Sequence, residues 1–365
     1  MKNLLFIAVA IMLLWSCHPK PVSNGSPADF KIVKGTNISD WLSQSDQRGA
    51  ERDSFFQEKD IIVIKEMGFD YIRLPIDEEQ MWDEKGVRHE DAFKLLTNCL
   101  DWCRTHQIKV IVDMHKLRSH NFNSAVNPLM IDLKEQEKFY RLWEDLSSVL
   151  QKYSLSDVAY ELLNAPFAVD PEQWNNVVAN AVKSIRALES ERIIVIGSNI
   201  YQSASTFDVL KVPDDKNIIL SFQFYEPFLL THYQAPWLGF KNYIGPVHYP
   251  GALLTNAEFD ALSADQQTIV KEFVGKEWNI AKLEEMMKLP LKKAKELGLQ
   301  VCCAEYGVFE NAPEADKIRW YNDMISVFNK NGIASSNFNY KSDAMGLLDG
   351  NGVKNEALIQ AVLKR

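Results

Sequence analysis

Six polar residues stand near the ends of short apolar stretches, and their types suit chemistry on a polar ligand. Any one of them could simply satisfy a backbone carbonyl or an ion pair, but six in similar positions are hard to attribute to packing. They combine a carboxylate, a guanidinium and an imidazole with amide and phenol groups, which bind polar substrates and transfer protons. In chain order they are Asn37, Arg73, His115, Asn164, Tyr225 and Glu305, with Trp41 and His232 in following loops.

The apolar stretches alternate with amphipathic segments, and this alternation predicts how the polar residues are brought together. Strands are predicted over residues 31–38, 68–76, 109–115, 158–165, 192–199, 217–225, 299–308 and 332–340. Helical periodicity appears between them, for example over residues 91–108, 137–153 and 317–331. Eight such units predict a single-domain (β/α)8 TIM barrel, whose site forms at the carboxyl ends of the strands. An open doubly wound sheet is the alternative, but no glycine-rich phosphate loop follows the first strand.

Composition and charge narrow the class of ligand. The chain has 365 residues, of which 46% are hydrophobic, 11% aromatic and 24% charged, and its net charge is −9. This composition is that of a globular protein rather than a disordered chain. No dense block of lysine and arginine is present, so binding to nucleic acid is not expected. Many aromatic residues and moderate acidity suit a neutral ligand better than a phosphate backbone.

The first twenty residues, "MKNLLFIAVAIMLLWSCHPK", predict export. A lysine precedes an apolar run that is too short to span a bilayer comfortably but has the size of a secretory signal. Residues 14–17 resemble a bacterial lipobox, in which Cys17 would be lipidated; an ordinary cleaved signal peptide is the alternative. We therefore expect a signal over residues 1–17, a flexible tether over 18–30 and the barrel over 31–365. The tether lacks the acidic cluster that, by resemblance to Bacteroidetes lipoproteins, would favour the cell surface, so a periplasm-facing lipid anchor is expected.

The four remaining cysteines are interpreted as small core residues. Cys99 and Cys103 lie four apart on a predicted helix, and Cys302 and Cys303 are adjacent on a predicted strand. Neither spacing suits a local disulfide or a C-x-x-C metal site. A long-range disulfide between the two pairs is the alternative if the protein lies in an oxidising compartment.

The strand-end residues and their flanks resemble glycoside hydrolase family 5, the cellulase and mannanase family, over essentially the whole mature chain. The motifs that carry this resemblance appear in the family's order: "KGTNISDWLS", "GFDYIRLPID", "VIVDMH", "YELLNAP", "SFQFYEPFLLTHYQAPW" and "CAEYGVF". The resemblance implies retaining hydrolysis of β-glycosides, in which two carboxyl groups about 5 Å apart act as nucleophile and acid/base. It implies no cofactor and no metal, and we expect the protein to act as a monomer.

The resemblance also implies roles for individual residues. Glu305 would be the nucleophile, supported by Tyr225. Arg73 and Asn164 would orient the nucleophile and the sugar 2-hydroxyl, and His115 would contact the sugar or support these residues. The acid/base position is occupied by Ala165, whose methyl group cannot transfer a proton.

Further departures from the family surround Ala165. Gln223 replaces a histidine, so an amide that only forms hydrogen bonds stands where a proton carrier is usual. Phe338 aligns with the tryptophan under the sugar and lacks its indole N–H, Asn339 replaces the aspartate after it, and Lys116 stands where many members have a second histidine. A laboratory mutation at residue 165 would have left these neighbours unchanged, so the group of changes indicates natural drift or repurposing.

Four other carboxylates are candidates to replace the acid. Glu161 shares strand parity with Ala165 but lies deeper in the predicted barrel, and Glu226 follows Tyr225 and should point to the opposite face. Asp343 and Asp349 lie in the loop after the last strand and could reach the cleft only if that loop folds over it. None is a convincing substitute.

Two functional hypotheses follow, and a third is kept. The favoured one is a family-fold lipoprotein that binds β-linked glycans of the β-glucan or β-mannan type, with severely impaired hydrolysis. The alternative is an active β-glycosidase or transglycosidase that uses Glu305 with a relocated acid. The third is a vestigial site with a functional surface elsewhere. Trp41, Trp237 and Tyr249 are candidates for stacking on sugar rings, although loop packing explains each equally well.

Overall fold

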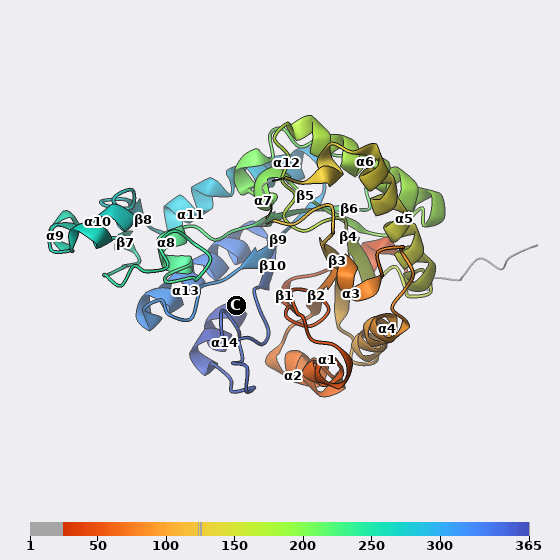
Figure 1. The fold of residues 1–365 in the computed structure, drawn as a ribbon, viewed down its shortest axis with the longest axis horizontal. Helices are drawn as coiled ribbons and strands as arrows, with labels where there is room; N and C mark the ends of the chain where they lie inside the picture. Colours follow the sequence, from red (N-terminus) through yellow and green to blue (C-terminus); the bar gives the residue numbers. More distant parts are fainter. Residues whose placement is uncertain (1–24, 123, 125, 365) are drawn as a thin grey trace, which may run out of the picture.

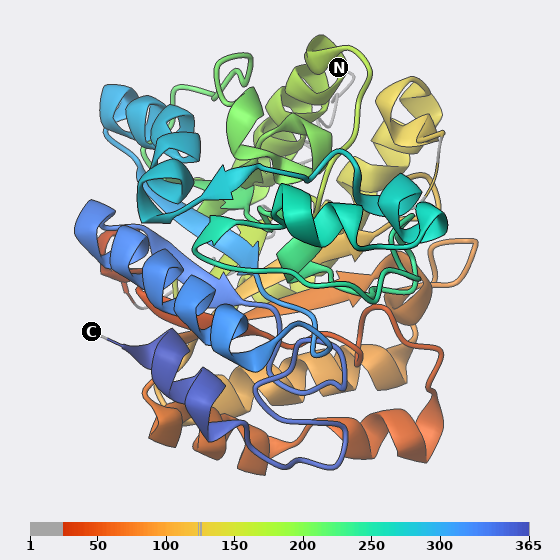
Figure 2. The same ribbon diagram turned by 90° about the vertical axis from the view of Figure 1, so that its left-hand side faces the viewer.

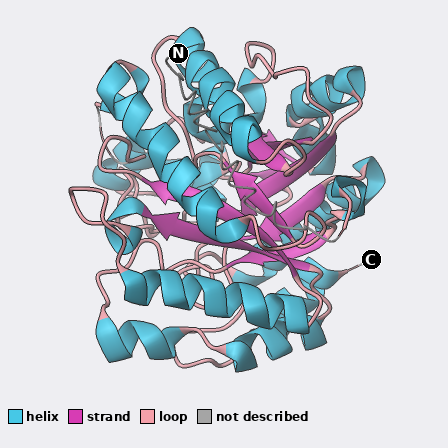
Figure 3. Ribbon diagram, turned by 90° about the vertical axis from the view of Figure 1, so that its right-hand side faces the viewer, coloured by secondary structure: helices cyan, strands magenta, loops and turns pink. Residues whose placement is uncertain are grey.

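The computed structural model describes residues 25–122, 124 and 126–364, and it forms a closed barrel of eight parallel strands. The strands neighbour one another in the order β1, β10, β9, β6, β5, β4, β3, β2 and back to β1. Figure 3 shows the strands at the centre of the molecule with helices around them. The predicted (β/α)8 barrel is confirmed. The barrel strands are β1 (Lys34–Asn37), β2 (Tyr71–Asp77), β3 (Lys109–Lys116), β4 (Val158–Glu161), β5 (Ile194–Gly197), β6 (Ile218–Gln223), β9 (Gln300–Tyr306) and β10 (Ala334–Asn337).

The helices lie in the segments between strands, where the sequence periodicity predicts them. The longer ones are α2 (Glu58–Met67), α4 (Glu90–Thr105), α5 (Leu133–Leu150), α6 (Pro171–Leu188), α12 (Lys288–Leu297), α13 (Glu314–Asn331) and α14 (Glu356–Leu363). Shorter helical segments are α1 (Gly49–Phe55), α3 (Glu78–Met81), α7 (Asn199–Gln202), α8 (Phe228–Thr231), α9 (Asn256–Asp260), α10 (Ala264–Val270) and α11 (Ile280–Met286), with single 3-10 turns at Pro27–Asp29, Pro128–Met130 and Ala204–Thr206. Within the described residues, none of the helices is long and apolar enough to cross a bilayer.

A long excursion separates β6 from β9. It contains α8, α9, α10 and α11 and a small antiparallel pair, β7 (Gly251–Ala252) and β8 (Glu277–Trp278). Figure 1 shows this segment, in green to cyan, extending to one side of the barrel, and Figure 2 shows it from that side. The excursion begins directly after Tyr225, one of the strand-end residues.

The barrel interior is closed by apolar residues at the end opposite the site. Phe30 and Ile32 are 3% exposed and belong to a cluster with inward-facing strand residues, among them Tyr71, Ile111 and Val195. The 3-10 turn Pro27–Asp29 immediately precedes them. The flexible tether predicted over residues 18–30 is therefore too long at its C-terminal end, because Phe30 already packs in the core. The lipobox and Cys17 lie outside the described residues.

All four described cysteines are buried and free. Cys99 and Cys103 lie on α4, and Cys302 and Cys303 lie on β9. Burial raises the pKa of the Cys103 and Cys303 thiols well above the ordinary value, which leaves them uncharged and unreactive. The prediction of small core residues is confirmed, and the long-range bridge that the sequence left open is not formed.

Candidate active site

Arg73 lies inside the barrel on β2, level with Asn37 at the end of β1. Its side chain is fully buried and contacts three carboxylates. Nη1 donates to Glu305 Oε1 at 2.6 Å, Nε donates to Glu161 Oε2 at 2.7 Å, and Nη2 lies 3.0 Å from Asp113 Oδ2. Nη1 also donates to Asn37 Oδ1 at 2.9 Å. One rigid guanidinium therefore fixes the position of Glu305 relative to β1, β3 and β4.

Glu305 is held at both carboxylate oxygens. Oε1 accepts from Arg73, and Oε2 accepts from the hydroxyl of Tyr225 at 3.0 Å. Burial raises the pKa of the Glu305 carboxyl above its ordinary value, while Arg73 acts in the opposite direction. The side chain is 7% exposed, so a small part of it is accessible to solvent. Glu305 is therefore a nearly buried carboxylate whose orientation is fixed by two donors.

His115 is neutral and presents a hydrogen-bond acceptor. Its Nδ1 lies 2.7 Å from Asp113 Oδ2, which places the ring proton on Nδ1 and leaves Nε2 as the acceptor. Gln44 Nε2 lies 3.0 Å from that Nε2, and Asn164 Nδ2 lies 3.4 Å from it. Burial lowers the pKa of His115 to about 4. The imidazole therefore carries no proton to donate into the cleft near neutral pH.

Ala165 stands at the end of β4 in an unusual backbone conformation. Its φ is 44°, in the left-handed region, which is uncommon for a residue with a Cβ atom. The preceding Asn164 donates its backbone N–H to Met114 O at 2.9 Å, which fixes the strand end. Ala165 is 4% exposed and offers only a methyl group. The turn at the strand end is formed, but its side chain cannot move a proton.

A chain of amides lies beside Ala165. Gln223 Nε2 donates to Asn164 Oδ1 at 2.7 Å and to Gln202 Oε1 at 2.8 Å. Gln202 Nε2 in turn donates to Glu161 Oε1 at 2.8 Å. Gln202 comes from α7, where Ile200, Tyr201 and Gln202 all have positive φ. Neutral amides therefore connect the strand ends of β4 and β6 on the side of Ala165.

Aromatic residues form one wall of the site. Phe338 is half-buried and packs in a cluster with Tyr225, Phe309 and Met345. Trp237 is 57% exposed, and its ring meets the rings of His232 and Phe309 edge to face at 6.1 and 5.5 Å. Phe338 and Trp237 thus lie where each could offer a face to a sugar ring.

Trp41 and Tyr249, the two other candidates for stacking on a sugar ring, are buried. Trp41 is fully buried, donates its indole N–H to Arg52 O at 2.9 Å and packs on Phe56. Tyr249 is 1% exposed, and its hydroxyl donates to Asp323 at 2.7 Å. The expectation that Trp41 stacks on a sugar is corrected, because both residues are core residues here and have no face open to a ligand.

Glu161 and Glu226 do not replace the missing acid. Glu161 is fully buried, and each of its oxygens accepts hydrogen bonds from Arg73, with Gln202 as a further donor. Glu226 Oε2 accepts from the backbone of Phe228 at 3.3 Å, and the cations that act on it, Lys276 and Lys282, belong to the excursion. The expected positions of both carboxylates, deeper and on the other face, agree with these contacts.

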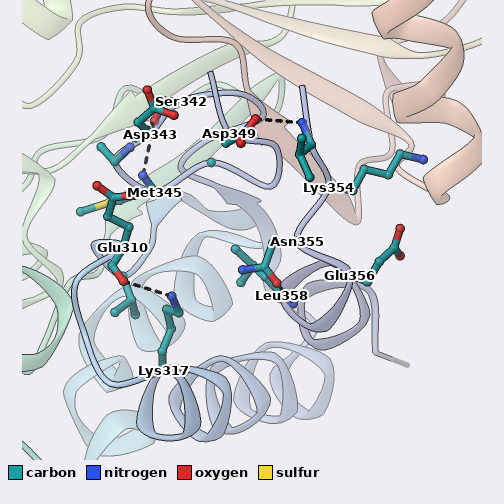
Figure 4. Close-up of a pocket in the computed structure, with 14 residues that line it drawn as sticks. Glu310, Lys317, Ser342, Asp343, Met345, Asp349, Lys354, Asn355, Glu356 and Leu358 are labelled. Carbon is teal, nitrogen blue, oxygen red and sulfur yellow. Dashed lines mark hydrogen bonds between the residues drawn. The ribbon is translucent and has the colours of Figure 1, made fainter. Parts of the chain in front are cut away.

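Asp343 and Asp349 line a separate cavity of about 490 Å³ next to α13 and α14. Figure 4 shows both residues there, together with Glu310 and Lys317. Asp343 accepts from the backbone of Gly350, and Asp349 accepts from Asn351 and Val353, so both carboxylates hold the turns of this loop. None of the strand-end site residues lines this cavity. The loop does not bring either aspartate to Ala165.

Asn339 and Lys116, the other two departures from the family pattern, contact neighbouring polar or aromatic residues. Asn339 is buried and donates to Ser39 and, at 3.1 Å, to Asp40, which ties the end of β10 to the loop after β1. Lys116 Nζ lies 3.9 Å from Asp77 Oδ2 and over the ring of Phe122.

The structure adds three residues that sequence reasoning did not place in the site: Gln44, Asp113 and Gln202. Asp113 precedes His115 by two on β3, so strand alternation could have placed them on one face. Gln44 lies in an irregular loop and Gln202 at the end of the distorted segment α7, and no periodic sequence pattern predicts either position.

Comparison with known proteins decides the family. A family model described as cellulase, glycosyl hydrolase family 5, matches residues 29–344. The chain belongs to glycoside hydrolase family 5. Endoglucanase C from Acetivibrio thermocellus is 32% identical over 319 residues, which is 84% of this chain and 90% of that protein. Cellodextrinase A from Ruminococcus flavefaciens is 30% identical over 309 residues, 83% of this chain and 84% of that protein.

Solved structures support the fold of this family 5 member. Endoglucanase Cel5A from Thermotoga maritima superposes with a TM-score of 0.74 at 22% identity, covering 93% of this chain and all of that chain. At this identity the likeness concerns the barrel alone. The family assignment gives the strand-end cluster its context, because a retaining glycosidase places its site at this end of the barrel.

Proposed function

We propose that this family 5 protein binds β-linked glucan oligosaccharides and hydrolyses them only very slowly. The observation that carries the proposal is the pairing of an oriented carboxylate at Glu305 with a methyl group at Ala165. Curated relatives at 30 to 32% identity are named as an endoglucanase and a cellodextrinase, which supports a β-glucan ligand. Loss of a positioned general acid/base costs roughly 10² to 10⁴ in rate.

In this proposal the retained residues act mainly in binding. Glu305, held by Arg73 and Tyr225, accepts hydrogen bonds from the sugar and keeps the capacity to attack its anomeric carbon. Asn164 meets the 2-hydroxyl, His115 supports Asn164, and Phe338 and Trp237 provide stacking faces.

The test combines binding and hydrolysis on the same glycans. Affinity would be measured for β-glucan, β-mannan, xylan and xyloglucan and their oligosaccharides, together with release of reducing ends. We expect micromolar to millimolar binding of β-glucan oligosaccharides with hydrolysis at least 100-fold below a family enzyme that has its acid. Brisk cleavage of unactivated polysaccharide would contradict the proposal, and absence of any glycan binding would favour a vestigial site.

A second candidate is an active glycosidase or transglycosidase restricted to substrates with good leaving groups. It is favoured by the contacts of Glu305, which a purely binding site does not require. A substrate whose leaving group departs without a proton bypasses Ala165 in the first step. The two candidates differ in turnover: the second requires steady release of product from such a substrate.

We further propose that the protein is exported and lipid-anchored through Cys17, facing the periplasm. The support is the sequence of residues 1–17, whose apolar run ends at Leu14-Trp15-Ser16-Cys17. Cys17→Ala should release the native protein from the membrane fraction or block its processing. Recovery of the wild-type protein wholly in the soluble periplasm would favour an ordinary signal peptide.

A further inference from the structure

The orientation of every amide near Ala165 follows from one ion pair. Glu161 is fixed by Arg73 through two hydrogen bonds, and its buried carboxylate can only accept. Gln202 must therefore point its Nε2 at Glu161, which it does at 2.8 Å. Its Oε1 then faces Gln223.

Gln223 meets an oxygen at each of its two protein contacts. One is Gln202 Oε1 at 2.8 Å, and the other is Asn164 Oδ1 at 2.7 Å, which also accepts from Arg73 Nη2. Gln223 must present its nitrogen to both, and these bonds use both of its amide hydrogens. Among the described residues, none donates a hydrogen bond to Gln223 Oε1. Because Gln223 is half-buried, that oxygen is left to accept from solvent or a ligand.

The backbone around Gln202 is shaped for this contact. Ile200, Tyr201 and Gln202 have φ values of 53°, 59° and 56°, a run of left-handed conformations that residues with a Cβ seldom adopt. This turn buries Gln202 completely. A Cβ atom at Gly197 would lie 2.2 to 2.6 Å from the Gln202 side chain, so a glycine is required beneath it. The packing therefore holds the Gln202 amide in one place.

Gln223 lies between the two positions that flank the reacting bond in this family. It pairs in register with Glu305 across β6 and β9, and it bonds to Asn164, the residue before Ala165. In a retaining glycosidase the nucleophile and the acid/base stand on either side of the anomeric carbon and the departing oxygen. The acceptor Oε1 thus stands near the oxygen attached to the anomeric carbon, on the side where a proton donor is missing.

We propose that the site recognises the free reducing end of a β-linked glucan oligosaccharide, with Gln223 Oε1 accepting the anomeric hydroxyl and Gln202 positioning Gln223. A glycosidic oxygen inside a chain has no hydrogen to donate, so it would face a carbonyl oxygen with lone pairs only. An anomeric hydroxyl has the hydrogen that this acceptor needs. The site then suits the products of glycan cleavage better than an uncut chain, and this inference rests on the glucan binding proposed above.

The first experiment uses the wild-type protein and three ligands. Calorimetry would compare cellotriose with methyl β-cellotrioside, whose anomeric oxygen has no hydrogen, and with the 1,5-anhydro analogue, which lacks that oxygen without added bulk. We expect both analogues to bind about tenfold more weakly than cellotriose. Equal or tighter binding of the 1,5-anhydro analogue would overturn the inference while leaving glucan binding intact. If none of the three binds, the proposed function itself fails, and the inference fails with it.

Two variants test the positioning role. Gln202→Leu removes the bond that fixes Gln223 and should reduce the tenfold discrimination to within about twofold, with little change for the anhydro analogue. Gln360→Leu, on the exposed face of α14, is the matched control and should keep the discrimination. If Gln202→Leu folds and still discriminates tenfold, Gln202 does not position Gln223. If it does not fold, Gln223→Leu removes the acceptor directly, and unchanged discrimination in that variant would overturn the proposal.

Discussion

At the β9 side of the site, a carboxylate is held by a guanidinium and a phenol; at the β4 side, the corresponding position is a methyl group beside neutral amides. Glu305 has Arg73 and Tyr225 as donors, and burial raises the pKa of its carboxyl. On the side of Ala165 stand Gln223 and Gln202. Their hydrogen bond fixes which amide atom donates and which accepts, but neither amide can transfer a proton. The two sides of one site therefore differ in chemistry: one presents an oriented carboxylate, and the other presents only neutral groups.

The amides on the β4 side bond to one another and to the strand ends rather than lacking partners. Gln223 donates two hydrogen bonds, to Asn164 Oδ1 and Gln202 Oε1, and Gln202 is the buried residue of a turn with three consecutive left-handed residues. Strained backbone persists where the surrounding structure determines it and is concentrated at functional sites.

The largest expected effect concerns the charge network beneath the β9 side. Arg73→Met would leave three buried carboxylates without their cation, and we expect a loss of about 3 to 5 kcal/mol in the free energy of unfolding. Arg88→Met is the matched control, because its pair with Asp145 is partly exposed and should contribute about 1 kcal/mol or less. Denaturant unfolding would measure both. Similar losses for the two variants would show that the network does not hold the site together.

The next effect tests how much of the β4 side has changed. Ala165→Glu places a carboxyl at the family position, but Gln223 and Phe338 remain altered. We expect hydrolysis of cellotetraose to rise by less than about tenfold, well short of the 10² to 10⁴ that a positioned acid/base supplies. The double variant Ala165→Glu, Gln223→His should exceed the single one. Near-family activity from Ala165→Glu alone would mean that the neighbouring changes matter little.

A third prediction follows from the pKa of Glu305. Because burial raises this pKa, the carboxyl is protonated at pH values where an exposed glutamate is already ionised. The rate of phenol release from an activated aryl β-cellobioside should therefore increase as pH rises through that pKa, about tenfold per unit on its acidic side. Tyr225→Phe removes a donor that lowers the pKa, so its midpoint should move to higher pH. A rate that is flat or falls over this range would exclude ionised Glu305 as the attacking group.

The smallest expected effect concerns the contribution of the exposed residue Trp237 to ligand affinity. Trp237→Ala should weaken binding of cellotetraose about three- to tenfold, because an exposed indole face stacks on a sugar ring. Trp41→Phe is the control at a buried position and should leave affinity nearly unchanged, although it loses the hydrogen bond to Arg52. Equal effects on affinity would show that Trp237 acts through packing rather than contact with the ligand.

The sequence predicts the barrel because apolar strand-like stretches alternate along it with segments of helical periodicity. Strand-end residues such as Arg73 and Glu305 could be found because every parallel strand ends at the same face. Burial of Trp41 could not be foreseen, since an aromatic residue in a loop packs or stacks with equal ease. Gln202 was missed for a different reason: its place depends on three consecutive left-handed residues, and no local propensity of Ile200 or Tyr201 predicts them.

The most direct test of the difference between the two sides is intact-protein mass spectrometry after exposure to 2,4-dinitrophenyl β-cellobioside. The dinitrophenolate leaves without a proton, so Glu305 can attack the anomeric carbon, but water then has no general base at Ala165. We predict a burst of about one phenolate per protein, slow turnover and a cellobiosyl adduct on Glu305. Azide should speed turnover and yield the β-cellobiosyl azide, and Glu305→Gln should abolish burst, adduct and azide effect. If cellobiose binds but no adduct forms, Glu305 is only a binding residue; rapid turnover without a burst, together with cleavage of cellotetraose, would show that another acid serves the β4 side and would contradict the account.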